Sequence, residues 1–211
     1  MLQDIDLSYD RTGALVTGKS LKVGGSLTVA GAPVGSPSTP QPADHGLIAW
    51  SGDPQSSTTQ GSVAANGTLY LSRVFIRSAT TVSKVWWINS SPGATATAGQ
   101  NFVGLINSTG TVLSTGSIDS VAVTNGPQSG TLATPQAVAA GAYWAALLIN
   151  AASPPTIARS GGLSASGNNI NLTAAAFRFA ANGTVLTSIP ASITPTSNTL
   201  TGAIALWMGV S

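Results

Sequence analysis

Charge is what this sequence has least of. Only 7% of its 211 residues are Asp, Glu, Lys or Arg, and Glu does not occur at all, whereas an ordinary soluble domain is about one quarter charged. Ser, Thr, Asn, Gln and Gly must therefore cover the surface. Because general acids, bases and metal ligands are mostly ionisable side chains, this scarcity argues against catalysis. We predict a non-enzymatic, β-rich building block that needs no cofactor and buries part of its surface in an assembly.

Basic runs, cysteine and long apolar segments are also absent. The net charge is +2, and no run of Lys or Arg could neutralise several phosphates, so we expect no nucleic-acid partner. The absence of cysteine excludes disulfides and thiolate metal sites. The strongest apolar run, residues 143–149, is too short to cross a bilayer, and residues 1–20 contain no apolar stretch of a secretory signal. We therefore expect synthesis in a cytoplasm without a signal peptide, and no insertion into a membrane.

A six-residue period marks the N-terminal region. Two rows of residues follow this spacing: Leu15, Leu21 and Leu27, and Thr17, Val23 and Val29. Within each unit the apolar residues are two apart, which is typical of a strand. Three units are too few for one chain to cover its own inner face. Three chains could supply one strand each per layer, which predicts a trimeric stalk, and the alternative is a short hairpin with coincidental spacing. The residues expected around the threefold axis are Leu15, Leu21, Val23, Leu27 and Val29.

Proline marks the boundary between this repeat and the rest of the chain. Three prolines between Gly35 and Pro42 favour extended backbone, as in a linker. We therefore divide the chain into an attachment arm and β-repeat stalk (1–35), a linker (36–45) and a head domain (46–211). The arm contains Asp4, Asp6 and Asp10, half of the six acidic residues.

The head domain alternates β-branched and aromatic runs with Gly, Asn, Pro and Ser, and no helical period is sustained. Strands are expected at residues 69–77, 82–89, 102–107, 111–115, 117–123, 143–150, 174–180 and 203–210. Eight or so antiparallel strands predict an all-β fold, a jelly-roll-like antiparallel β-sandwich. Residues 143–149 and 203–210 are apolar on both faces, which requires either a third layer or another subunit. We favour the subunit interface.

Residues 13–20, Gly-Ala-Leu-Val-Thr-Gly-Lys-Ser, match the phosphate-binding pattern G-x-x-x-x-G-K-[ST]. That motif needs a buried strand before it and a helix after it. Here the preceding stretch is charged and the following one is strand-forming and interrupted by glycines. We interpret the match as a by-product of the six-residue repeat.

The single histidine, His45, lies next to Asp44 and near Asp53. One His with two carboxylates could bind a metal, or the His could serve a catalytic triad. Because His45 ends a proline-rich linker, we interpret it as a solvated residue and predict no catalytic, cofactor or metal site.

Trp86 and Trp87 are adjacent on an expected strand, so they point to opposite faces. One should fill the core, and the other should meet solvent, a neighbouring subunit or a ligand. Aromatic faces stack on sugar rings and supply much of the area of protein interfaces. The two tryptophans are therefore our candidate contacts for an interface or a glycan.

Several segments resemble the minor tail and receptor-binding (fibre-type) proteins of tailed bacteriophages, especially those of actinobacteria. They are Val-Ser-Lys-Val-Trp-Trp at 82–87, the Gly-rich run 93–110, Ala-Gly-Ala-Tyr-Trp-Ala-Ala-Leu-Leu-Ile-Asn at 140–150, and Pro-Pro-Thr at 154–156. The Leu-x-Val-x-Gly units and Gly-Ala-Pro-Val-Gly at 31–35 likewise resemble the shafts of phage fibres. The resemblance implies a homotrimer on the virion surface, attached to other tail or capsid proteins through its N-terminal arm.

The resemblance also implies a function. A distal β-domain of this kind would adhere to the host, with a cell-surface glycan as a potential partner. The rival expectation is an architectural role, as a capsid decoration or head-fibre protein without a receptor of its own.

Overall fold

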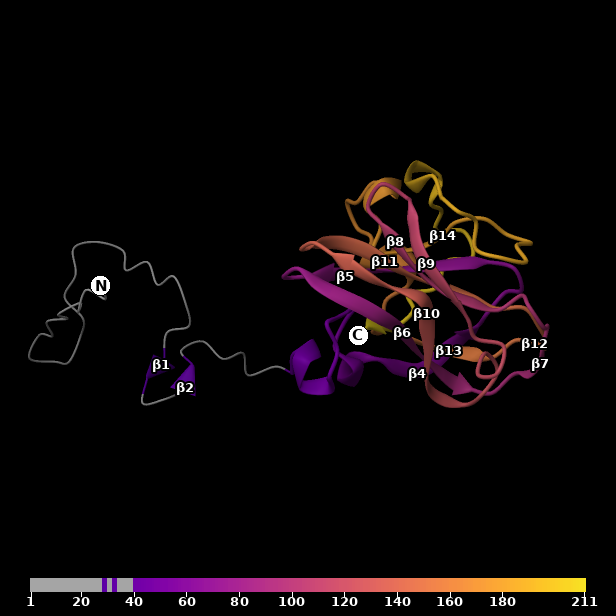
Figure 1. The fold of residues 1–211 in the computed structure, drawn as a ribbon. Helices are drawn as coiled ribbons and strands as arrows, with labels where there is room; N and C mark the ends of the chain where they lie inside the picture. Colours follow the sequence, from indigo (N-terminus) through magenta and orange to yellow (C-terminus); the bar gives the residue numbers. More distant parts are fainter. Residues whose placement is uncertain (1–27, 30–31, 34–39) are drawn as a thin grey trace, which may run out of the picture. The chain divides into compact units, whose positions relative to one another are not determined.

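The computed structural model describes residues 28–29, 32–33 and 40–211 (Figure 1). The chain divides into two compact units, Met1–Thr39 and Pro40–Ser211. In the first unit, β1 (Thr28–Val29) pairs antiparallel with β2 (Ala32–Pro33), which sets Val29 opposite Ala32. At Val29 the chain thus forms a short hairpin. The other axis residues predicted for the stalk lie outside the described residues, namely Leu15, Leu21, Val23 and Leu27, so the trimeric stalk stays a prediction.

The second unit, called the head here, is built from two antiparallel sheets. The six-stranded sheet has the order β3 (Ala49–Trp50), β15 (Met208–Val210), β6 (Thr80–Ser91), β13 (Thr156–Arg159) and β4 (Thr58–Val63), with β10 (Gly126–Val138) also paired to β6. The five-stranded sheet has the order β14 (Phe179–Ala181), β5 (Leu69–Ile76), β11 (Gly141–Leu148), β8 (Phe102–Asn107) and β9 (Val112–Ser117). The all-β, antiparallel sandwich predicted from the sequence is confirmed, whereas its jelly-roll character stays a prediction.

Smaller elements complete the head. β7 (Ala94–Ala96) pairs with β12 (Ala151–Ser153). The short helical turns are η1 (Pro42–His45), η2 (Pro54–Ser56), α1 (Ala165–Asn168), η3 (Ala174–Ala176) and η4 (Pro195–Ser197). The head therefore includes residues 40–45, which we had assigned to the linker.

The main core lies between the two sheets. Val85 and Trp87 of β6 point inward and meet Val74 of β5 and Leu147 of β11, all fully buried. Because successive side chains of a strand alternate between faces, the same strands present different residues to the outside. This alternation places Trp87 in the core and Trp86 on the outer face of the six-stranded sheet.

A third layer covers the outer face of the five-stranded sheet. On that face Leu71, Trp144 and Leu148 form a second apolar cluster with Phe177 and Ile189 from the C-terminal segment, the orange-to-yellow run beside β14 in Figure 1. The indole N–H of Trp144 donates to the carbonyl oxygen of Phe177 at 3.1 Å. The subunit interface that we favoured for residues 143–149 is therefore wrong, because the chain itself covers both faces of this strand.

Some expected strands were misplaced. Residues 119–123 form turns, and residues 174–180 contain η3 and only the start of β14. Of the segment 203–210, only Met208–Val210 forms a strand. Residues 204–207 are buried outside any strand, although Leu206 forms an isolated β-bridge with Arg159. Ile204 and Leu206 belong to the main apolar cluster.

The sequence also concealed β10. Its Pro127 and Pro135 argue against a strand, but proline is tolerated in an edge strand, and β10 pairs with β6 alone. Near its middle, β10 closely approaches β9 of the other sheet: a Cβ added to Gly116 would lie 1.8 Å from the carbonyl oxygen of Thr131. Glycine at 116 lets the two sheets meet at this corner.

Candidate binding site

The residues that the structure describes form no cluster of potential metal ligands. Across 28–29, 32–33 and 40–211, no group of three or more His, Cys, Asp or Glu side chains could hold a metal ion. The same residues contain no helix long and apolar enough to cross a membrane.

The residues weighed for a metal or a triad have other roles. A carboxylate oxygen of Asp44 accepts from the backbone N–H of Gln41 at 2.8 Å, and one of Asp53 accepts from that of Gln55 at 2.8 Å, so each caps a short helical turn. The ring of His45 packs edge-on against Trp50, with the ring centres 5.3 Å apart. The structure thus occupies the two carboxylates with backbone hydrogen bonds and the imidazole with an aromatic contact.

Of the two tryptophan candidates, only Trp86 faces outward. Trp87 is fully buried, and its indole N–H donates to the side-chain oxygen of Asn89 at 3.0 Å. Trp86 is half-buried, its indole N–H donates to the hydroxyl of Ser211 at 2.9 Å, and the ammonium of Lys84 lies 6.0 Å from its ring centre. These contacts hold the ring of Trp86 in place at the surface.

Trp86 lines an apolar groove of about 220 Å³, which we call the aromatic groove. Its walls come from four parts of the head, and they include His45, Leu47, Pro54, Trp86, Ile88, Pro127 and Trp207. Register explains part of this grouping, because Pro127 of β10 lies opposite Ile88 of β6. Trp207 is only 6% exposed, and its indole N–H donates to the carbonyl oxygen of Gly52 at 2.8 Å. The groove offers flat, apolar surfaces and no acid–base pair.

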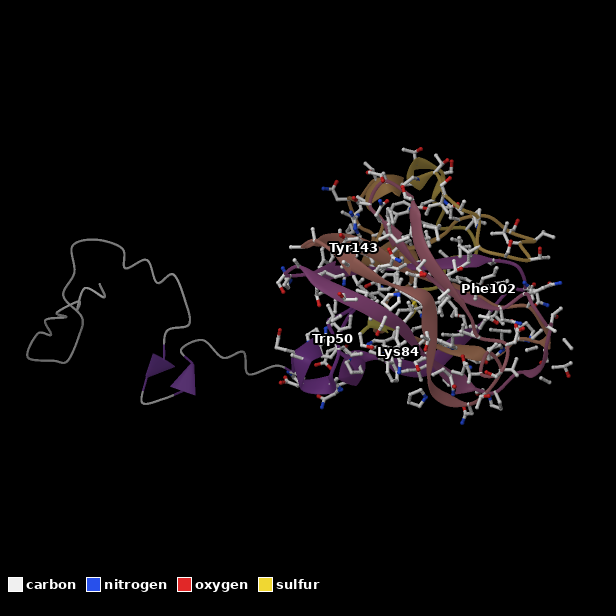
Figure 2. All side chains as sticks on the ribbon, in the orientation of Figure 1. Trp50, Lys84, Phe102 and Tyr143 are labelled. Carbon is white, nitrogen blue, oxygen red and sulfur yellow. The ribbon has the colours of Figure 1, made fainter. Side chains whose placement is uncertain are left out.

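A second, larger cavity of about 440 Å³ is also lined by residues of the segment 41–54, and we call it the arginine hollow. Its walls include Trp50, Phe75, Arg77 and Arg178. Figure 2 shows Trp50 near the first residues of the head, on the same side of the molecule as Lys84 of β6. The segment 41–54 contributes to both cavities, since His45 and Pro54 line the groove and Trp50 lines the hollow.

One lining residue of each cavity belongs to the same row across the six-stranded sheet. Gly209 of β15 pairs with Trp50 of β3 on one side and with Trp86 of β6 on the other. Residues directly opposite each other in antiparallel strands point to the same face, and neighbouring strands are about 4.8 Å apart, so the two tryptophans stand roughly 10 Å apart on one face. Gly209 has no side chain, and the side chains of Leu47 and Trp207 fill the space above it, 3.0 Å and 3.5 Å from where its Cβ would lie.

Strand alternation also explains why two arginines lie on the same side of β5 as Phe75. β5 and the residue that follows it carry three side chains spaced two residues apart, namely Arg73, Phe75 and Arg77. Phe75 is 46% exposed. The guanidinium of Arg73 lies 5.1 Å from the ring centre of Trp144 and 5.9 Å from that of Phe75, and burial lowers its pKa from the ordinary value. This Arg-x-Phe-x-Arg pattern is visible in the sequence, but we did not single it out.

No family model, no curated protein and no solved structure matches this chain. A function must therefore be argued from the two cavities and from the composition of the chain. The likeness to phage tail proteins stays a hypothesis.

Proposed function

We propose that this protein is a non-enzymatic structural protein of a phage virion, and that its head adheres to a glycan on the host surface through the aromatic groove. The observation that carries this proposal is the outward ring of Trp86, fixed by a hydrogen bond to Ser211 and set in an apolar groove on a rigid sheet. A ring fixed in this way is ordered before a ligand arrives, which lowers the entropic cost of binding.

The chemistry of the groove suits a sugar better than a charged peptide or a nucleotide. One face of many sugar rings carries only C–H groups, and such a face stacks on an aromatic ring. The groove combines the half-buried Trp86 with Pro127, above the largely buried Trp207, and its lining contains no Lys, Arg, Asp or Glu. Weak stacking of this kind needs no acid or base, which agrees with the 7% charged content of the chain.

Adhesion through weak sites requires several copies. We propose a homotrimer, formed through the six-residue repeat of the N-terminal segment, which attaches to other tail or capsid proteins at the virion surface. Three groove sites on one rigid particle gain apparent affinity without any new contact, because the second and third binding events are intramolecular. Sedimentation of the full chain should give about three times its mass of 20.9 kDa, and a stable monomer would contradict the stalk.

The groove is tested by binding of the full chain to actinobacterial cells and to their isolated wall polysaccharide. Trp86→Ala should weaken binding about tenfold, which corresponds to about 1.4 kcal/mol per site. Trp86→Phe keeps an aromatic face and should stay within a few-fold of the unchanged protein. Val185→Ser, at a position that is 87% exposed and outside the groove, is the control for a surface change.

The rival architectural role predicts a different pattern. A protein that binds no host cell and no wall polysaccharide, yet enters particles normally, would overturn the adhesin and favour a capsid decoration or head fibre. If Trp86→Ala and the unchanged protein bind equally well, the aromatic groove is not the glycan site. Far-UV circular dichroism of each variant shows whether a loss of binding comes from unfolding.

A further inference from the structure

The few charges of the head are unevenly distributed. Residues 40–211 contain five cationic side chains, Arg73, Arg77, Lys84, Arg159 and Arg178, and three acidic ones, Asp44, Asp53 and Asp119. Two of the five cations line the arginine hollow, and no acidic side chain lines it. A third cation, Arg73, is two residues from Phe75 on the same strand. In a chain with so few charges, this concentration favours an anion at the hollow.

The two arginines of the hollow have unused hydrogen-bonding capacity. Arg77 is exposed, and its guanidinium has no ion pair and no hydrogen bond with any residue of 40–211. Arg178 donates one N–H to the carbonyl oxygen of Ser51 at 3.0 Å, which orients its side chain beside the hollow. A guanidinium has five N–H donors in a planar fork that matches the oxygens of a carboxylate or a phosphate. Arg178 therefore keeps donors for a ligand while its side chain is held in position.

The hollow also offers aromatic surface and suitable size. Trp50 and the half-exposed Phe75 line it beside the arginines. Its volume of about 440 Å³ lies in the usual range for small-ligand sites, about 300–1,000 Å³. Guanidinium groups next to aromatic rings suit a ligand that carries both an anionic group and an apolar ring face.

We infer that the arginine hollow binds the anionic group of an acidic surface polysaccharide whose neighbouring sugar ring lies in the aromatic groove. This inference rests on the proposed function and defines its ligand: a glycan with carboxylate or phosphate groups, not a neutral one. Trp50, which lines the hollow, and Trp86, which lines the groove, lie on the same face of the six-stranded sheet. Their separation of roughly 10 Å is one that two linked sugar units span, passing over the Leu47 side chain that lies above Gly209. The hollow then selects acidic polymers, and the groove supplies stacking common to many glycans.

The experiment measures binding of the full chain to three immobilised polymers: phosphorylated dextran, polygalacturonate and neutral dextran. The unchanged protein should bind at least one anionic polymer about tenfold more tightly than dextran, and added NaCl should weaken that binding. Arg77→Gln should lower affinity for the anionic polymer about tenfold without changing binding to dextran. Preference for phosphorylated dextran assigns a phosphate ligand, and preference for polygalacturonate assigns a carboxylate.

Arg159→Gln is the matched control, because it removes one positive charge at a residue that does not line the hollow. If Arg159→Gln weakens binding as much as Arg77→Gln, the effect is one of net charge and the inference is overturned. Arg178→Lys keeps the charge but loses the planar fork, so it should also weaken binding to the anionic polymer.

The failure of this inference differs from the failure of the proposed function. If dextran and both anionic polymers bind equally and Arg77→Gln changes nothing, the hollow does not select anions. The groove still stands in that case, provided that Trp86→Ala weakens binding to host walls. If Trp86→Ala also has no effect on any surface, both proposals are overturned.

Discussion

Replacing Trp144 by Ala tests whether the chain covers the outer face of its own five-stranded sheet. Trp144 is fully buried in the second apolar cluster, between Leu71 and Leu148 of the sheet and Phe177 of the C-terminal segment. Its indole N–H donates to the carbonyl oxygen of Phe177 at 3.1 Å. The substitution therefore removes a large apolar side chain and leaves a partly buried carbonyl without its donor.

The expected cost follows from these contacts. Truncation of a buried Trp to Ala costs about 3–5 kcal/mol of unfolding free energy, and about 1 kcal/mol of this belongs to the lost hydrogen bond. A value of about 4 kcal/mol should lower the melting temperature by roughly 8–16 °C in a domain of this size. Trp144→Phe keeps most of the ring and loses only the donor and part of the volume, so it should cost about 1–2 kcal/mol.

Thermal and urea unfolding of the full chain, followed by far-UV circular dichroism, measures these differences. The unfolding is measured at two protein concentrations that differ about tenfold. Because the partners of Trp144 belong to the same chain, the difference between variant and unchanged protein should not depend on concentration. If Trp144→Ala lowers the free energy of unfolding by less than about 1 kcal/mol, or by an amount that grows on dilution, the third layer is refuted. The outer face would then be buried by another subunit.

Two further perturbations test other parts of the head. Hydrogen bonds lower the pKa of Asp119 from its ordinary 3.8, and the first of them comes from the backbone N–H of Gly99 at 2.6 Å. The carboxylate therefore adds to the free energy of unfolding. This contribution is complete above pH 3.8 and is lost as the pH falls through the pKa of the folded state. Asp119→Asn should therefore lower the stability at neutral pH only slightly, because solvent screens this carboxylate. Urea unfolding should show the difference shrinking in acid, so a pH-independent difference would contradict it. Gly116→Ala should cost about 1–3 kcal/mol, because its Cβ would lie 1.8 Å from the Thr131 carbonyl oxygen. Gly162→Ala, where nothing lies within 4 Å, should change the melting temperature little, and equal effects of the two would contradict the close approach.

Strands that are apolar and bounded by turn residues could be predicted from the sequence. Residues 102–107 form β8 with the expected bounds, and residues 69–77 match β5 to within one residue. β10 could not be predicted in this way, because its two prolines are acceptable only at the edge of a sheet. That edge position exists only after β6 has paired with it.

The candidate site shows the same division. Alternation in the sequence predicts that Trp86 and Trp87 face opposite sides, and the structure places Trp87 in the core. Nothing local to the sequence predicts that Trp50, Phe75 and Arg178 line one cavity, since these residues are far apart along the chain. Their grouping depends on how β3 and the C-terminal segment pack beside β5.

The sequence alone determined the all-β class and the alternation of faces, because both follow from the two-residue period of an extended backbone. It also determined the scarcity of charge, which limits the chemistry open to the chain. Only the tertiary structure decided what covers each face. Residues 143–149 are apolar on both sides whether a subunit or a third layer buries them. In the folded chain, the segment around Phe177 and Ile189 covers the outer face. Burial is a property of packing between distant segments, so a local pattern can require a cover without specifying which part of the chain supplies it.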